Sequence, residues 1–316
     1  MRLFAFQTRG LSQPSTEANS SASSQQEFGA AVEGADLLRG GSQVHRQCRL
    51  IQGARVAAVS TPLLWHIPFS HFNEKVRWTL DYKRIAHRRR VLGPDYLIRA
   101  WRATGHGTLP ILFLDGHAIG DSTHIIAALE QRHPEPPLYP ADAVARQRAL
   151  ALEDDFDERL GPALRAAFVT PLFRHDPDVA LRVLMTGMPD QAYRRLRPLV
   201  RIFPAFYRFR HKISDRNLEA DRAIVNAALD RIEQERQGRA YLVGDAFTVA
   251  DLTAAALLSP LLQPAEIQYP LRVELPGYLQ DYRATVLQHP AARWAAGIYR
   301  LHRGRSAEVS HRSTAA

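Results

Sequence analysis

A proline-rich segment at residues 132–137 divides the chain into two parts with different hydrophobic patterns. Between residue 61 and this segment, short apolar runs alternate with stretches of helical periodicity, in the order β-α-β-α-β-β-α. After the segment, apolar residues recur at helical spacing and strand patterns are scarce. The sequence therefore predicts an α/β domain followed by an all-α helical bundle.

Turn and capping residues refine these elements. The Asp-Gly pair at 115–116 predicts a tight hairpin, and Asp121 with Ser122 predicts a helix start because both residue types are preferred N-caps. Thr248 and Asp251 resemble a capping box at the start of a helix that is apolar on all sides, as expected at the centre of a bundle. Strands are predicted at residues 63–67, 87–92, 111–114 and 117–119, and helices at 70–82, 95–103, 122–131, 141–168, 191–212, 218–237, 249–262, 275–288 and 290–302.

Length and composition bound the domain organisation. A chain of 316 residues with 46% hydrophobic residues has enough material for a substantial core and is predicted to contain two domains. Residues 1–60 are rich in Ser, Gln, Ala and Gly and show no sustained period, so they bury too little apolar surface to offset the entropy of ordering. We predict a disordered extension at 1–60, an α/β domain at 61–133, a linker at 134–140, an all-α domain at 141–303 and a flexible tail at 304–316.

Cysteine and histidine content exclude several kinds of site. Cys48 is the only cysteine, which excludes an internal disulfide, a Cys-x-x-Cys redox pair and a multi-cysteine metal site. His66 and His71 have no third ligand at a recognisable spacing, so no metal is predicted. No apolar run is long enough for a membrane span, and the N-terminal apolar stretch is too short for a secretory signal. We therefore expect a cytoplasmic protein without a transmembrane segment.

The formal net charge of +9 is unevenly distributed. Residues 191–212 contain seven Arg or Lys residues and no acidic residue, interleaved with aromatic residues. This segment could line a pocket for an anionic acceptor, lie on a membrane surface, or pack its aromatic residues in the core with its arginines in solvent. We favour core packing because it is the commonest use of an amphipathic stripe. Nucleic-acid binding is the least favoured reading, and no nucleic-acid partner is predicted.

Ser70 lies where a predicted strand meets a predicted helix. Phe72, Val76 and Leu80 follow it at helical spacing. The first turn of a helix has free N–H groups and the positive end of the dipole, and this arrangement stabilises an anion such as a thiolate. Because Ser is also a preferred N-cap, a purely structural role in capping is the alternative.

Four motifs give residues 61–302 a resemblance to the cytosolic glutathione transferases. The first, from Pro68 to Arg77, is similar to the family's segment with a catalytic Ser or Cys at the start of the first helix. The second, Thr108-Leu109-Pro110, is similar to the family's Val-Pro step with a cis proline. The third, Asp121-Ser122, resembles the Glu/Gln-Ser pair that binds the γ-glutamyl end of glutathione. The fourth, residues 242–251, is similar to the capping box of the central helix.

The resemblance implies a thioredoxin-like, glutathione-binding first domain, with glutathione as co-substrate and no metal. It also implies a homodimer that transfers glutathione to a small hydrophobic electrophile bound between the domains. A hydroxyl that donates to the glutathione thiolate lowers the pKa of the thiol and raises its reactive fraction. The predicted catalytic residues are Ser70 and Asn73, and the predicted glutathione-binding residues are Leu109, Pro110, Asp121 and Ser122.

The segment around Ser70 departs from the pattern of this family in the residues that would supply a thiol or a phenol. Relatives that reduce disulfides have Cys at the position of Ser70, and some similar sequences have Cys where this chain has Asn73. Classes that use a tyrosine near the end of the first strand have it close to the position of His66. A second hypothesis is therefore a transferase-like binding protein whose catalysis is weak or lost.

Overall fold

The computed structural model describes residues 61–93, 95–199, 205 and 217–309, which belong to one compact unit. A four-stranded sheet has the order β2-β1-β3-β4, with β1 and β2 parallel and the other neighbours antiparallel. Its strands are β1 (Leu63–His66), β2 (Arg88–Val91), β3 (Ile111–Leu114) and β4 (His117–Gly120), and its helices are α2 (His71–Tyr82), α3 (Tyr96–Thr104) and α4 (Ser122–Arg132). The predicted β-α-β-α-β-β-α order and the thioredoxin-like fold class are confirmed.

One face of the sheet packs against α2 and α4. The apolar residues on this face form one core cluster: Leu64, Val76, Leu80, Ile85, Leu112, Leu114, Ile125 and Leu129. Except for Ile85, which follows α2, they come from β1, from alternate positions of β3 and from one side of each helix, as the periods of two and 3.6 residues require. Asp115 and Gly116 both have positive φ, 49° and 83°, which is the backbone of the predicted tight hairpin.

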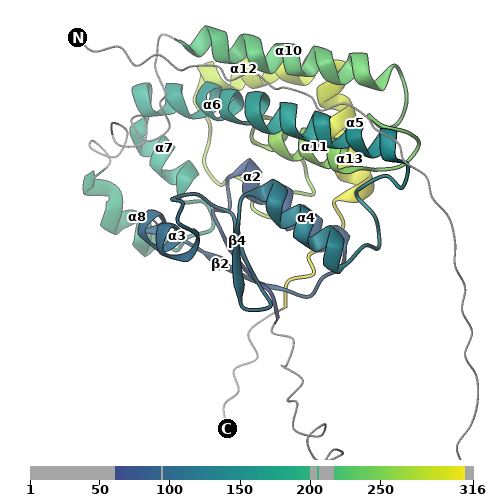
Figure 1. Ribbon diagram of the computed structural model, residues 1–316. Helices are drawn as coiled ribbons and strands as arrows, with labels where there is room; N and C mark the ends of the chain where they lie inside the picture. Colours follow the sequence, from purple (N-terminus) through teal and green to yellow (C-terminus); the bar gives the residue numbers. More distant parts are fainter. Residues whose placement is uncertain (1–60, 94, 200–204, 206–216, 310–316) are drawn as a thin grey trace, which may run out of the picture. The chain divides into compact units, whose positions relative to one another are not determined.

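The second half of the described chain is helical, as predicted, and it lies on the side of α2 and α4 in Figure 1. All 14 residues of α11 (Val249–Leu262) are buried, and α11 packs against α2, α13 (Pro290–His302) and α5 (Ala143–Asp155). A helix that is apolar on all sides is stable only where other elements surround it, which explains its central position. The elements are α5 (Ala143–Asp155), η1 (Phe156–Leu160), α6 (Gly161–His175), α7 (Pro177–Leu184), α8 (Asp190–Leu196), η2 (Arg197–Leu199), α10 (Leu218–Arg236), α11 (Val249–Leu262), α12 (Gly277–Gln288) and α13 (Pro290–His302).

Two predicted helices differ from the structure. The single helix expected at 141–168 is interrupted by the π-helical turn η1 and continues to His175 as α6. Pro162 follows this turn, and because it has no N–H to donate, one regular helical hydrogen bond is missing at this position. The helix α7, which was not predicted, begins at Pro177, a residue type favoured at the first helical position. Of the helix predicted at 191–212, the described part is α8 and η2, while 200–204 and 206–212 lie outside the described residues.

The segment 304–309, assigned from the sequence to a flexible tail, is held by hydrogen bonds. The Val309 N–H donates to the His87 carbonyl at 2.8 Å, and the Ala307 N–H donates to Asp81 Oδ1 at 2.8 Å. The sequence gives no sign of this because the partners are more than two hundred positions away. The predicted disordered extension at 1–60 and residues 310–316 lie outside the described residues, and the domain limits otherwise stay predictions.

None of the helices in the described ranges has the length and apolarity that a membrane span requires.

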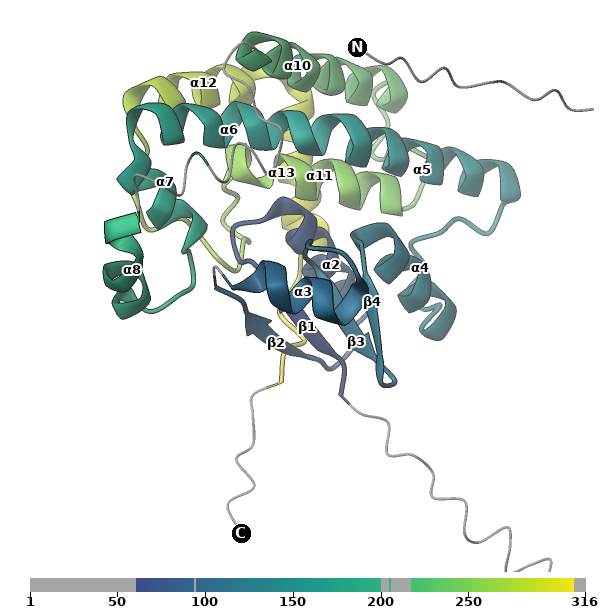
Figure 2. The same cartoon turned by 60° about the vertical axis from the view of Figure 1, so that its left-hand side comes forward.

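Figure 2 shows the sheet from another side, with α3 in front of the strands and the helices α5, α6 and α10–α13 above. The site predicted from the sequence therefore has to be sought where the β1–α2 connection meets this helical part.

Candidate functional site

The connection from β1 to α2 places Ser70 at the N-terminus of α2. The Ser70 N–H donates to the Ile67 carbonyl at 3.2 Å, and the Glu74 N–H donates to the Ser70 carbonyl at 2.9 Å. Ser70 is the N-cap residue with extended backbone, φ −71° and ψ 124°, but its side chain makes no capping hydrogen bond. The hydroxyl is therefore left for another partner at the positive end of the helix.

Asn73 lies one turn into α2 and is almost fully buried. Its Oδ1 accepts a hydrogen bond from the Ile67 N–H at 3.3 Å. The Asn73 carbonyl oxygen thus holds the connection that carries Ser70, and the amide nitrogen is the end of this side chain that remains to donate to a ligand.

A pocket opens beside this connection and encloses about 1260 Å³, including space open to solvent. Ser70, Asn73 and Leu109 line it, and the Leu109–Pro110 peptide bond is cis, as the family resemblance implies. Most of the remaining lining is apolar and comes from α2, α3, α6 and α7. Within the lining, Arg165 is the one side chain with a fixed charge. Its apolar and aromatic members include Phe69, Phe72, Leu164, Phe168, Leu184, Met185 and Met188.

His71 follows Ser70 and also borders the pocket. Burial, and then the positive charge of Arg165, lower the pKa of His71 to about 3, although a hydrogen bond with the Gly161 backbone acts in the opposite direction. The imidazole is therefore neutral at neutral pH. Burial, followed by the charge of Arg77, likewise lowers the pKa of His66 well below its ordinary value. Among the described residues, no group of three His, Cys, Asp or Glu side chains is arranged to hold a metal ion.

Asp121 and Ser122 lie at the start of α4, outside the lining of the pocket. Asp121 Oδ1 accepts from the Thr123 N–H at 2.9 Å, which is an ordinary capping bond. Its backbone is unusual for a residue with a side chain, with φ 69° and ψ 133°. Asp142 makes the same bond to Val144 with an ordinary φ of −64°, so capping alone does not require the strained backbone at Asp121. Such strain is common at ligand-binding positions.

Next to Asp121 lies a buried charged cluster that the sequence analysis missed. Lys75 Nζ lies 2.7 Å from Glu153 Oε1 and 2.5 Å from Asp157 Oδ2, and Thr123 Oγ1 contacts the same two carboxylates at 3.1 and 3.0 Å. Burial raises the pKa of both carboxyl groups despite the charge of Lys75. The cluster joins α2, α4, α5 and η1, and no local pattern marks residues so far apart in sequence.

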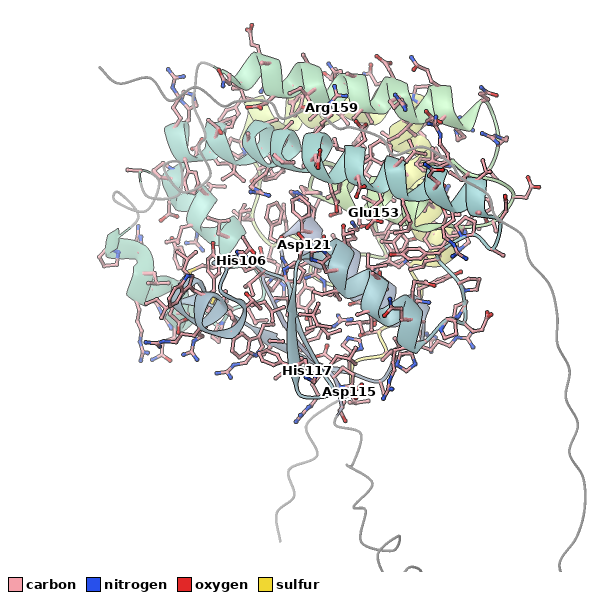
Figure 3. The ribbon with its side chains drawn as sticks, viewed as in Figure 1. His106, Asp115, His117, Asp121, Glu153 and Arg159 are labelled. Carbon is pink, nitrogen blue, oxygen red and sulfur yellow. The ribbon has the colours of Figure 1, made fainter. Side chains whose placement is uncertain are left out.

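Figure 3 shows Asp121 and Glu153 near each other where α4 approaches α5, while Asp115 and His117 lie at the far tip of the hairpin. The cluster contains two carboxylates and one ammonium, and the carboxylate of Asp121 lies close enough to raise the pKa of Asp157 further. Acidic side chains therefore gather near the start of α4.

Two family models match the sequence in the order of its two structural halves. The glutathione S-transferase N-terminal domain matches residues 64–137, and the glutathione S-transferase C-terminal domain matches residues 199–290. Together they cover more than half of the chain. The chain belongs to the glutathione S-transferase family.

The chain is also similar to several solved structures. The β-etherase LigF from Sphingobium sp. strain SYK-6 is 18% identical, with a TM-score of 0.51, covering 75% of this chain and 98% of its own. A glutathione S-transferase from Methylobacillus flagellatus KT, solved with glutathione bound, is 19% identical, with a TM-score of 0.46 and coverage of 74% and 98%. One from Methylobacterium radiotolerans JCM 2831, in complex with glutathione sulfonate, is 20% identical, with a TM-score of 0.47 and coverage of 80% and 99%. No curated protein matches the sequence.

Proposed function

We propose that this protein activates the thiol of glutathione for attack on a small hydrophobic electrophile. The observation that carries the proposal is the Ser70 hydroxyl, which lines the pocket at the N-terminus of α2 and takes no part in capping. A hydroxyl that donates to a thiolate, next to the positive end of a helix, favours the ionised thiol. Asn73 is proposed as a second donor, because its amide nitrogen lies on the same helix turn.

The remaining predicted residues are proposed to hold the peptide. The backbone of Leu109, next to cis-Pro110, is the proposed partner of the cysteinyl part of glutathione, which would pair with it like an added strand. Asp121 is the proposed acceptor for the γ-glutamyl ammonium, and Ser122 with the N-terminus of α4 is the proposed site of the carboxylate. The strained backbone of Asp121 and the negative charge around it support the placement of the ammonium.

The electrophile is proposed to occupy the apolar part of the pocket. Phe69 of the β1–α2 connection packs against Phe168 of α6, with ring centres 5.2 Å apart, so both halves of the described chain contribute to this wall. Holding the thiolate and the electrophilic carbon in one pocket makes their reaction effectively unimolecular. A homodimer and a cytoplasmic location are further proposals that rest on the family resemblance.

The proposal is tested with the Ser70→Ala variant and 1-chloro-2,4-dinitrobenzene as electrophile. We expect kcat/KM for conjugation to fall about 100-fold, because removing one donor from a developing or stabilised anion has an effect of this order. Thr248→Ala, a variant at a hydroxyl N-cap on α11, is the control and should retain its turnover per folded molecule. Equal turnover in Ser70→Ala and the wild type would remove Ser70 from the mechanism.

The alternative function is a transferase-like binding protein without appreciable catalysis. It is favoured by the β1–α2 connection itself, where the described residues supply neither a cysteine nor a tyrosine. Isothermal titration separates the two functions. Binding of glutathione below millimolar concentration, followed by conjugation, supports the transferase, whereas no heat at millimolar glutathione supports the interaction protein.

A further inference from the structure

One face of α2 buries a row of charged side chains that the proposed chemistry does not use. Glu74, Arg77 and Asp81 lie on this face, and their exposed fractions are 1%, 0% and 5%. Charged residues are rarely buried to this extent unless they are paired. The hydrogen-bond partners of these three side chains therefore indicate their structural role.

Arg77 binds the connection that carries Ser70. Its Nη2 donates to the Pro68 carbonyl at 2.8 Å, and its Nη1 donates to the Ile67 carbonyl at 3.3 Å and lies 3.0 Å from His66 Nδ1. The Ile67 carbonyl also accepts the Ser70 N–H. One guanidinium thus contacts three successive residues, from the end of β1 into the connection, and only Phe69 separates them from Ser70.

Glu74 and Arg303 hold this guanidinium in place. Arg77 Nε donates to Glu74 Oε2 at 2.8 Å, and Arg303 Nε donates to Glu74 Oε1 at 2.6 Å. Arg303 is fully buried, and its Nη1 also donates to Asp81 Oδ2 at 2.9 Å. Burial opposes ionisation of Glu74, but the charges of Arg303 and Arg77 outweigh it and keep the pKa of this carboxyl below its ordinary value.

We propose that Arg77 is a positioning residue for the Ser70 hydroxyl, and that Arg303, beyond the last helix, acts on the same site through Glu74. The inference rests on the proposed function, because it concerns the alignment of Ser70 with a glutathione thiolate. Arg77 and Arg303 touch no reacting atom in this scheme. They fix the backbone on which the donor stands, and a displacement of about 1 Å in a reacting group is enough to reduce a rate about 100-fold.

The geometry of arginine matters for this role. A guanidinium presents a planar fork that donates in several fixed directions, whereas the ammonium of lysine is a single compact centre. Lysine at position 77 or 303 therefore keeps the charge but cannot make all the contacts at once. Arg283 offers a matched control, because it donates to two successive carbonyls at the C-terminal end of α11, Leu261 at 2.7 Å and Leu262 at 3.0 Å, and is not among the residues that line the pocket.

The test compares Arg77→Lys, Arg303→Lys and Arg283→Lys with the wild type in two measurements. The first is the pKa of the thiol of bound glutathione, followed through the ultraviolet absorbance of the thiolate. We expect it to rise by about 1 in Arg77→Lys, to rise less in Arg303→Lys and to stay unchanged in Arg283→Lys. The dissociation constant for glutathione should change less than about threefold, because the proposed γ-glutamyl contacts at α4 are intact.

The second measurement needs no ligand. Hydrogen exchange of the Ser70 amide should be about tenfold faster in Arg77→Lys, and faster to a smaller extent in Arg303→Lys, because the carbonyl that it contacts is less firmly held. If wild-type protein fails to bind glutathione, the proposed function is wrong while this exchange rate still tests the positioning by Arg77. If folded Arg77→Lys has the wild-type exchange rate at the Ser70 amide and the wild-type pKa of the glutathione thiol, the inference is overturned. Should Arg77→Lys not fold, the same two measurements on Arg303→Lys provide the test.

Discussion

Among the described helices, α2 and α11 each have a hydroxyl residue as N-cap, and they use it in opposite ways. At α11, Thr248 and Asp251 form a complete capping box in which Asp251 Oδ2 accepts from both the N–H and the hydroxyl of Thr248 at 2.8 Å. At α2, the Ser70 hydroxyl makes no capping bond and lines a pocket. The same residue class in the same position therefore stabilises one helix and is left free at the other. The hydroxyl left unused at the start of α2 is the group that the proposed contact with a thiolate requires.

The largest expected effect on stability is that of removing the Asp251 carboxylate at the start of α11. Asp251 is fully buried and also accepts from the Leu242 N–H at 2.8 Å. In Asp251→Ala, buried donors lose their partner, so we expect the free energy of unfolding to fall by about 3–5 kcal/mol, measured by urea denaturation. The exposed neighbour Asp245 serves as control, and Asp245→Ala should change it by less than about 0.5 kcal/mol. A loss below about 1 kcal/mol in Asp251→Ala would mean that the box is not the main support of α11.

A smaller difference lies in the first helical residue, which is titratable His71 in α2 and apolar Val249 in α11. Burial, and then the charge of Arg165, hold the pKa of His71 at about 3 in the folded protein against an ordinary value of 6.5. His71 therefore takes up a proton near pH 6.5 in the unfolded chain, but only near pH 3 in the folded protein. The stability that depends on neutral His71 is complete above pH 6.5 and is lost as the pH falls.

Between pH 7 and pH 5 this effect should lower the free energy of unfolding by about 2 kcal/mol. His71→Gln, which lacks the titrating group, is the comparison. Its free energy of unfolding should fall by about 2 kcal/mol less than that of the wild type over the same pH interval. The contributions of the carboxylates are common to both proteins and cancel in the difference. Parallel pH profiles for the two proteins would show that His71 is protonated, or exposed, in the folded state.

The fold was predictable because its signals are local. The apolar periods of β1, α2 and β3, the Asp-Gly hairpin and the capping box each lie within one short stretch, and each prediction is confirmed. The interruption of the helix at η1 was missed, although Pro162 marks it. The segment 304–309 was missed because its order comes from Asp81 and His87, which belong to the first half of the described chain.

The site was predictable only in part, for a related reason. The structure brings Ser70, Asn73 and Leu109 to one pocket and places Asp121 and Ser122 at the start of α4, and their roles stay predictions. The contacts around them were not predictable. Arg303 and Glu74 are 229 positions apart, and Lys75 and Asp157 are 82 apart. A buried ion pair between residues so far apart is formed by the packing of whole elements, and a single sequence contains no pattern that joins its two members.

The smallest expected change in stability is that of Ser70→Ala, and it decides most directly whether the Ser70 hydroxyl caps α2 or is free to bind a ligand. Thr248→Ala should lower the free energy of unfolding by about 1–2 kcal/mol, because it removes a capping bond and leaves Asp251 with one fewer donor. Ser70→Ala should change it by less than about 0.3 kcal/mol, since no capping bond is lost. Both variants are measured by urea denaturation without glutathione, so that ligand binding does not contribute. A cost of about 1 kcal/mol or more in Ser70→Ala would identify Ser70 as an ordinary cap, and the hydroxyl would then not be free to donate to a thiolate.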